Sequence, residues 1–287
     1  MLHKIYSILA VAKTECRRIF FNPRIMIAGM LLIFIENLVI QPLIGRAEKM
    51  NAPLNIAEPF VAVGNSGALL LFIPSVFMIL VSDFPAVGRN MMMVIPRTGR
   101  IKWLTGQLLA ALFNAISYVL IIFAACCIFT LKYGVISSEW SDTVTKYSSV
   151  FPDEGNSYIS EYLPSNLYNQ LSFPDALLHT FLLLILYLFV LCLVISFFKI
   201  LAMKTAGITM AFILIACGVI TCSLKMKAMW LFPMANTISW LHYSEAFREP
   251  IKNMGESYLY FTTLIIIGIV LNVAAICKAD LNAMEEL

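Results

Sequence analysis

Residues 176–198 read ALLHTFLLLILYLFVLCLVISFF and include no Asp, Glu, Lys or Arg. A helix of about 20 such residues is long enough to cross the hydrocarbon core of a lipid bilayer. The stretch is apolar at nearly every position rather than at every second one, which favours a helix over the strand of a transmembrane barrel. It therefore predicts a membrane-spanning helix.

Stretches of this kind recur along the chain and together predict six spans: about Arg24–Ile44, Asn65–Val81, Trp103–Leu131, Ala176–Phe198, Thr205–Leu224 and Tyr258–Ile276. Of the 287 residues, 60% are hydrophobic and 13% are charged, whereas soluble domains average about 45–50% apolar and about 25% charged. This surplus excludes a soluble enzyme and a disordered chain. The net charge of +3 is too small to indicate a nucleic-acid partner. We expect an all-α protein whose solvent is the lipid bilayer.

The Lys and Arg residues divide unevenly between the two sides of this topology. Twelve fall in the N-terminal segment, the second–third connection, the fourth–fifth connection and the tail, and eight fall in the longer loops on the other side. Because basic residues concentrate in short cytoplasmic loops, both termini are expected in the cytoplasm. An even number of spans requires the same arrangement.

Residues 1–23 predict an amphipathic helix at the inner membrane surface, ahead of the six-helix domain of residues 24–287. Its apolar positions recur at helical spacing: Ile5, Leu9, Ala12, Cys16 and Ile19. Arg17 and Arg18 fall elsewhere around the helix, as in helices that lie in the interface. The segment is either a lipid anchor alone or a helix that also contacts a cytoplasmic partner.

The connection between the second and third spans, residues 82–110, reads SDFPAVGRNMMMVIPRTGRIKWLTGQLLA. The apolar run at residues 91–95 is too short to span and is flanked by Arg89 and Arg97. It predicts a short helix near the membrane surface. Its methionine-rich side needs a cover of lipid or of a protein groove, and Met suits an irregular groove.

Polar and small residues also fall within the predicted spans. Glu36 and Asn37 lie near the middle of the first span, where a charged side chain is costly unless it faces a cavity or a partner. They have either a pathway or gating role or a structural hydrogen bond between helices. Gly106, Ala110 and Asn114 recur every four residues in the third span, a spacing typical of close helix packing.

The 82–110 connection resembles that of the membrane subunits of ABC-2 type ABC transporters. Members often carry an acidic and then a basic residue, an apolar run, Pro-Ser/Thr-x-Arg, and then an aliphatic residue with Gly-Lys-Leu-Leu-Ala. The residues that match here are Asp83, Arg89, Pro96, Arg97, Thr98, Arg100, Leu104, Gly106, Leu108, Leu109 and Ala110. The N-terminal stretch KTECRRIFFNPRIM resembles the family's Glu-Leu-Arg-x-x-x-x-x-Pro pattern through Glu15, Arg17, Arg18, Asn22 and Pro23. Gln107 stands where the family usually has Lys.

The resemblance implies the permease subunit of an exporter in a bacterial plasma membrane. It would be one half of a dimer of identical or similar permease subunits, with a separate ATP-binding cassette subunit docked on its cytoplasmic side. Segment 82–102 would be the coupling helix. The residues implied in coupling are Arg17, Arg18, Asp83, Arg89, Met92, Arg97 and Arg100.

The chain itself carries no sequence GxxxxGK[ST], the loop whose amides and Lys hold phosphates. We therefore expect no enzymatic activity, no cofactor and no catalytic or metal-binding residue in this chain, and ATP and Mg²⁺ would be bound by the partner subunit. An intramembrane enzyme is disfavoured because no paired His or Ser/His constellation lies in the spans. An ion channel is disfavoured because no filter-like sequence is present.

Two long loops are expected outside the cell. The loop of residues 132–175 is acidic and is either a solvated cap or an external gate or recognition surface. The excursion of residues 225–256 is aromatic and predicts a re-entrant or interfacial hairpin, which in the resembling family closes the pathway from outside. The residues assigned to the pathway or gate are Glu36, Asn37, Trp230, Phe232 and Trp240.

The leading hypothesis is therefore export of a hydrophobic or peptide-like substrate. The alternative is a non-transporting membrane immunity or sensor protein that binds an extracellular peptide. Such a protein would keep the aromatic hairpin but would need no ATPase.

Overall fold

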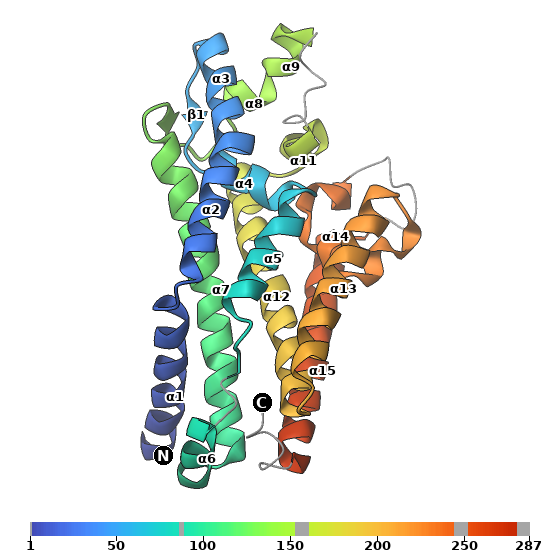
Figure 1. Cartoon of the computed structure of the whole chain (residues 1–287). Coiled ribbons are helices and arrows are strands. Elements are labelled where there is room, and N and C mark those ends of the chain that lie inside the picture. Colours follow the sequence, from blue (N-terminus) through green and yellow to red (C-terminus); the bar gives the residue numbers. More distant parts are fainter. Residues whose placement is uncertain (1, 86–88, 153–160, 244–251, 280–287) are drawn as a thin grey trace.

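The computed structural model describes residues 2–85, 89–152, 161–243 and 252–279. Within these residues the chain is almost entirely helical. Its strands there are the two-residue β1 (Leu54–Asn55) and β2 (Gly134–Val135), which pair in parallel. The remaining elements form an elongated bundle with short helices gathered at one end (Figure 1). We call that end the cap end, and the opposite one, which carries α6, the α6 end.

Five helices in the described part are long and apolar enough to cross a membrane. They are α2–η1–α3 (Ile25–Met50), α7 (Arg100–Thr130), α12 (Phe173–Ile200), α13 (Lys204–Ser223) and α15 (Met254–Lys278). Each overlaps one of the predicted spans. The chain is thus an all-α protein of the multi-pass membrane class.

The second predicted span, Asn65–Val81, is matched by α5 (Leu69–Leu80). The helix before it, α4 (Glu58–Asn65), meets α5 at a bend of 87°, and the two make a sixth candidate span if the pair counts as one. Non-helical backbone at membrane depth needs a cover of protein. Every residue of α4 is buried, which supplies that cover.

Helix α1 (Leu2–Phe20) confirms that the N-terminal segment is helical. It runs lengthwise alongside the first half of α7 and continues toward α2 (Figure 1), so its position at the inner membrane surface stays a prediction. A Cβ added at Gly106 would lie 2.8 Å from Val11 Cβ and 2.9 Å from the Ile8 carbonyl oxygen. The small residue predicted for close packing is therefore what lets the two helices touch.

Helix α6 (Arg89–Thr98) confirms the short helix predicted in the 82–102 segment. Gly99 separates it from α7 with φ +87°, a conformation that L side chains rarely adopt. Ile95 packs with Trp103 and Ile276 in a small cluster at the α6 end. The side chains of residues 86–93, and so of the predicted coupling residues Arg89 and Met92, lie outside the described part.

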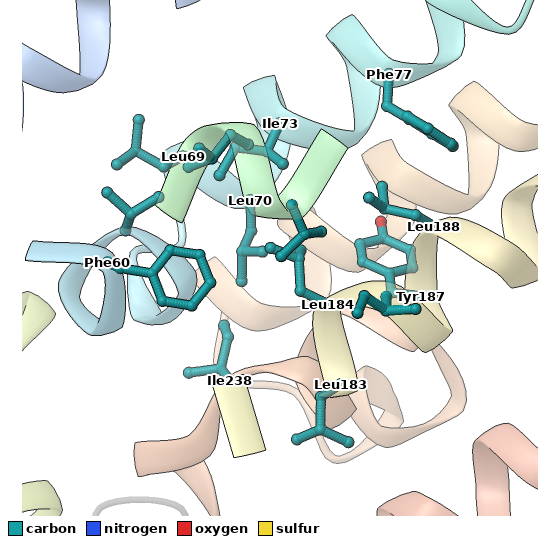
Figure 2. Packing of buried hydrophobic residues seen from close by; sticks show 14 of the residues in the cluster. Phe60, Leu69, Leu70, Ile73, Phe77, Leu183, Leu184, Tyr187, Leu188 and Ile238 are labelled. Atoms are coloured by element: carbon teal, nitrogen blue, oxygen red, sulfur yellow. The ribbon is translucent and has the colours of Figure 1, made fainter. Parts of the chain in front are cut away.

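The main core lies between α4, α5 and α12, with the hairpin after α13 closing one side (Figure 2). Phe60, Leu70, Leu184, Tyr187 and Ile238 meet there. Helix α12 is central because it packs against α4, α7, α13 and α15. The shorter elements are α8 (Asp142–Thr145), α9 (Tyr147–Val150), α11 (Ser165–Gln170), η3 (Lys227–Leu231), α14 (Pro233–Thr237) and η4 (Ser239–Tyr243).

Candidate functional site

A polar junction forms where the chain leaves α5 on its way to α6. The backbone carbonyl of Asp83 accepts hydrogen bonds from Arg18 Nη2 at 3.0 Å and from Lys199 Nζ at 2.5 Å. Its carboxylate pairs with Arg24 Nη1 at 2.6 Å, and the same nitrogen donates to Ser82 Oγ at 2.6 Å. Cations from α1, from the residue before α2 and from the end of α12 thus converge on one short segment.

Glu15 extends this junction into the interface between α1 and α7. Its side chain is 3% exposed, forms an ion pair with Arg18 and accepts a hydrogen bond from Gln107 Nε2 at 3.5 Å. Burial raises the pKa of the Glu15 carboxyl, and the Arg18 guanidinium opposes that rise. Arg18 contacts both Glu15 and Asp83, so it connects the α1–α7 interface to the segment that precedes α6.

Arg100 forms hydrogen bonds to another helix of the fold. Its Nη1 donates to the carbonyl oxygens of Ile276 at 3.1 Å and Cys277 at 2.9 Å. These carbonyls belong to the last turn of α15, where unpaired acceptors and the helix dipole favour a cation. Arg100 therefore fixes the end of α15 against the start of α7.

Of the residues predicted to couple, the structure brings together Arg18 and Asp83. Arg17 and Arg97 are exposed, and neither forms an ion pair within the described residues. The sequence prediction did not include Glu15, Arg24 or Lys199 in the site. Glu15 is part of the stretch KTECRR, but the sequence gives no sign that its carboxylate is buried. Lys199 is separated from Asp83 by more than a hundred residues, so only the packing of α12 reveals that contact.

Glu36 lies in the π-helical turn η1 (Glu36–Ile40), midway along the first span. Its Oε1 accepts from Gln41 Nε2 at 3.3 Å, and Asn37 Nδ2 donates to the Ile33 carbonyl at 2.8 Å. Both bonds stay within the same helix, so they are not the bond between helices that was one of the two alternatives. Glu36 is half-buried, and Asn37 and Gln41 are exposed.

At the cap end, the predicted hairpin packs against the break between α4 and α5. Asn65 Oδ1 accepts from the Ser239 backbone N–H at 2.8 Å, and the Asn65 carbonyl accepts from Trp240 Nε1 at 3.0 Å. On the other side, a Cβ added at Gly218 would lie 2.9 Å from Met234 Cβ. The predicted gate residue Trp240 therefore contacts the broken helix directly.

His242 ties the hairpin to α15. Its Nδ1 lies 2.8 Å from the Lys252 carbonyl oxygen and its Nε2 lies 3.4 Å from Ser257 Oγ, which donates to Asn236 Oδ1 at 2.8 Å. Trp230 is buried with its ring centroid 5.1 Å from that of His242. Burial lowers the pKa of His242. Because Ser257 is fully buried and donates to Asn236, this serine–histidine contact is a structural network.

Two predicted gate residues thus lie inside the hairpin: Trp230 is buried, and Phe232 is half-buried with its Cβ 3.6 Å from the position of a Cβ at Gly218. We therefore describe the hairpin as closed against the bundle.

Glu58 organises the remainder of the cap end. Its side chain is fully buried and accepts from the backbone N–H of Asn55 at 3.0 Å and of Ser141 at 2.6 Å, and from Ser141 Oγ at 2.7 Å. Arg46, from α3, lies 4.5 Å over the Tyr147 ring. The described part of the 132–175 loop is therefore packed in places on α3 and β1, while residues such as 135–139 are exposed.

The fold and these contacts define an all-helical, multi-pass membrane protein with a polar junction at one end and a closed hairpin at the other. Comparisons with protein-family models, with curated proteins and with solved structures find no match to this chain. No group of three or more His, Cys, Asp or Glu residues in the described ranges is placed to hold a metal ion.

Proposed function

We propose that this chain is the permease subunit of an ATP-driven exporter of the ABC-2 type, in a bacterial plasma membrane with both termini cytoplasmic. The observation that carries the proposal is the polar junction at Asp83. Motion of α6 against a docked ATP-binding cassette subunit would reach Asp83 first. From there, hydrogen bonds that involve charged groups lead into α1, α2 and α12. Such bonds are shorter and stronger than neutral ones, so they suit the transmission of a displacement.

Helix α12 supplies a physical link from this junction to the hairpin. Lys199 at its α6 end bonds Asp83, and Thr180 near its cap end lies 3.3 Å from Asn65 Nδ2. The two residues are about 28 Å apart along the helix at about 1.5 Å per residue. Asn65 in turn holds the hairpin. A tilt of α12 would therefore alter the two ends together, as alternating access requires.

The outward polar side chains of the first span support a second permease subunit. Glu36, Asn37 and Gln41 would meet hydrocarbon in an isolated protomer, at a cost of roughly 2.5–3.5 kcal/mol for a charged group. A second copy of the chain at this face would cover them or enclose them in a polar pathway. The substrate would then be a hydrophobic or peptide-like molecule that passes between the two subunits.

The experiment is a mild-detergent purification of the tagged chain from cells that express its candidate ATPases, with ATP hydrolysis assayed in the eluate. An ATPase is expected to co-purify at near one-to-one stoichiometry. Arg97→Glu is expected to abolish its recovery, because Arg97 is exposed on α6 and has no ion-pair partner within the described residues. Arg100 is unsuitable for this test because its loss would release the end of α15.

Lys227→Glu is the matched control, since it makes the same charge change on an exposed residue at the cap end. It should leave ATPase recovery unchanged. Absence of any ATPase under several gentle detergents, or full recovery with Arg97→Glu, would count against the exporter.

The packed cap end favours one alternative, a non-transporting immunity or sensor protein that binds an extracellular peptide. Glu58 and its partners preorganise a surface there, which a peptide receptor would use. This function would persist in cells deleted for every partner ATPase, whereas export would cease.

A further inference from the structure

A second site lies between the end of α1 and the helices α2, α5 and α7. A cavity of about 240 Å³ lies there, toward the α6 end of the spans. Its walls are almost wholly apolar and include Phe20, Ile25, Leu32 and Ile121. Gly29 also lines it, and a Cβ added at Gly29 would meet nothing within 4 Å.

One wall residue is polar and buried without a partner. Asn114 is 4% exposed, and neither its Oδ1 nor its Nδ2 finds a hydrogen-bond partner among the described residues. The other polar group in the wall is already used, because Tyr118 Oη donates to the Ile73 carbonyl at 2.9 Å. An amide left unpaired in an apolar interior is costly, and a native fold keeps one where something pairs with it.

The rim of the cavity is open to the outside of the protomer. Phe20 is 41% exposed and Ile121 is 38% exposed, so the wall continues onto the apolar surface that faces lipid. A cavity of about 150 Å³ holds a benzene-sized molecule. The larger space found here suits one alkyl chain entering sideways from the bilayer, rather than a complete two-chain lipid.

We propose that this cavity binds a single-chain amphiphile whose polar group presents a donor and an acceptor side by side, as a carboxamide does. The alkyl chain fills the space beside Gly29 and Leu32. The carboxamide pairs with Asn114, which offers one donor and one acceptor in return. The site is formed by one protomer and needs no ATPase, so it stands independently of the exporter proposal.

The test uses octanamide carrying a photoreactive diazirine in its chain, cross-linked to the purified full-length chain in nanodiscs. Adducts are located by peptide mass spectrometry and are expected on the cavity walls of α2 and α7. Unlabelled octanamide should compete about tenfold better than methyl octanoate, which has the acceptor but lacks the donor. N-acetyl-leucinamide distinguishes the two sources of a carboxamide. If it competes with the probe as well as octanamide does, the ligand is peptide-like rather than an acyl amide.

Two variants separate binding from folding. Asn114→Leu removes the amide but keeps a side chain of the same branched shape, so the preference for octanamide over the ester should disappear while the chain stays folded. Gly29→Leu fills the cavity and should abolish the adducts. Gly45→Leu is the matched control, because a Cβ there also meets nothing within 4 Å and Gly45 does not line the cavity. Equal competition by the ester and the amide in the unmodified chain, or adducts unchanged in Gly29→Leu, would overturn the proposal.

Discussion

Arg18 shows how one side chain can join two parts of this molecule. Its guanidinium reaches the Glu15 carboxylate on the same helix and the Asp83 carbonyl beyond α5. An arginine can serve two acceptors because it presents five donors in a fixed plane. A lysine at this position would offer a point charge and would lose the geometry of one contact.

Gly64 provides the prediction at this scale. A Cβ added there would overlap Thr180 Cγ2, and Thr180 cannot rotate freely because its Oγ1 donates to the Ala176 carbonyl at 2.8 Å. Gly64→Ala should therefore lower the free energy of unfolding in detergent by about 1–3 kcal/mol, the usual cost of overpacking a core, and with it the melting temperature. Gly45→Ala has open space and should be neutral or stabilising. Equal melting temperatures for the two variants would contradict this prediction, because they would show that α4 and α12 can move apart without loss of stability.

Small residues in the sequence allow pairs of helices in this chain to pack closely. Helix α1 lies on α7 at Gly106, and α14 lies on α13 at Gly218, where a Cβ would lie within 3 Å of a neighbouring atom in each case. The hairpin also depends on the break after Asn65, because in a continuous helix the Asn65 carbonyl that accepts from Trp240 Nε1 would instead accept a bond from within the helix. The broken span and the hairpin thus form one unit.

The pH dependence of the hairpin is the prediction at the scale of elements. Burial lowers the pKa of His242 in the closed hairpin below its ordinary value of 6.5. As the pH falls below 6.5, the open form gains a proton that the closed form resists, so the closed form loses stability. After correction for the intrinsic exchange rate, the protection of the amides of η3, α14 and η4 should therefore decrease as the pH is lowered from 7.5 to 5.5.

His242→Gln supplies the control, since glutamine keeps hydrogen-bonding capacity but does not titrate in this range. Its amide protection, corrected in the same way, should be independent of pH over the same interval. An equally steep decrease in that variant would assign the effect to another group.

At the scale of the whole molecule, α12 connects the polar junction to the hairpin, and the first span presents polar groups outward. A soluble protein would place such groups in water, but here the surrounding solvent is hydrocarbon. The exporter proposal therefore includes a second permease subunit that covers Glu36 and Asn37.

Cross-linking tests this assembly. In a background that lacks the native cysteines, Asn37→Cys should give a dimer in membranes treated with a short bifunctional maleimide. Ile267→Cys, on α15, is similarly placed within a span and 50% exposed, and it should remain monomeric. Dimers from both variants would indicate random collision, and dimers from neither would mean that η1 of the first span does not face a second copy.

The sequence by itself determined the membrane class, the position of five spans, the N-terminal helix and the short helix after Asp83. These features depend on local composition and on helical spacing, which are properties of neighbouring residues. It also indicated that Gly106 and Ala110 would pack closely, because small residues every four positions leave a groove.

Only the tertiary structure decided which charges meet and where a helix breaks. Lys199 bonds Asp83, Glu58 binds Ser141 and Arg100 caps α15 across long separations in the chain, and no local pattern encodes those pairs. The 87° bend after Asn65 likewise depends on partners distant in the chain, because Trp240 Nε1 donates to the freed Asn65 carbonyl and Thr180 Oγ1 accepts from the Asn65 side chain. Hydrophobicity places residues in the membrane, whereas packing selects their partners.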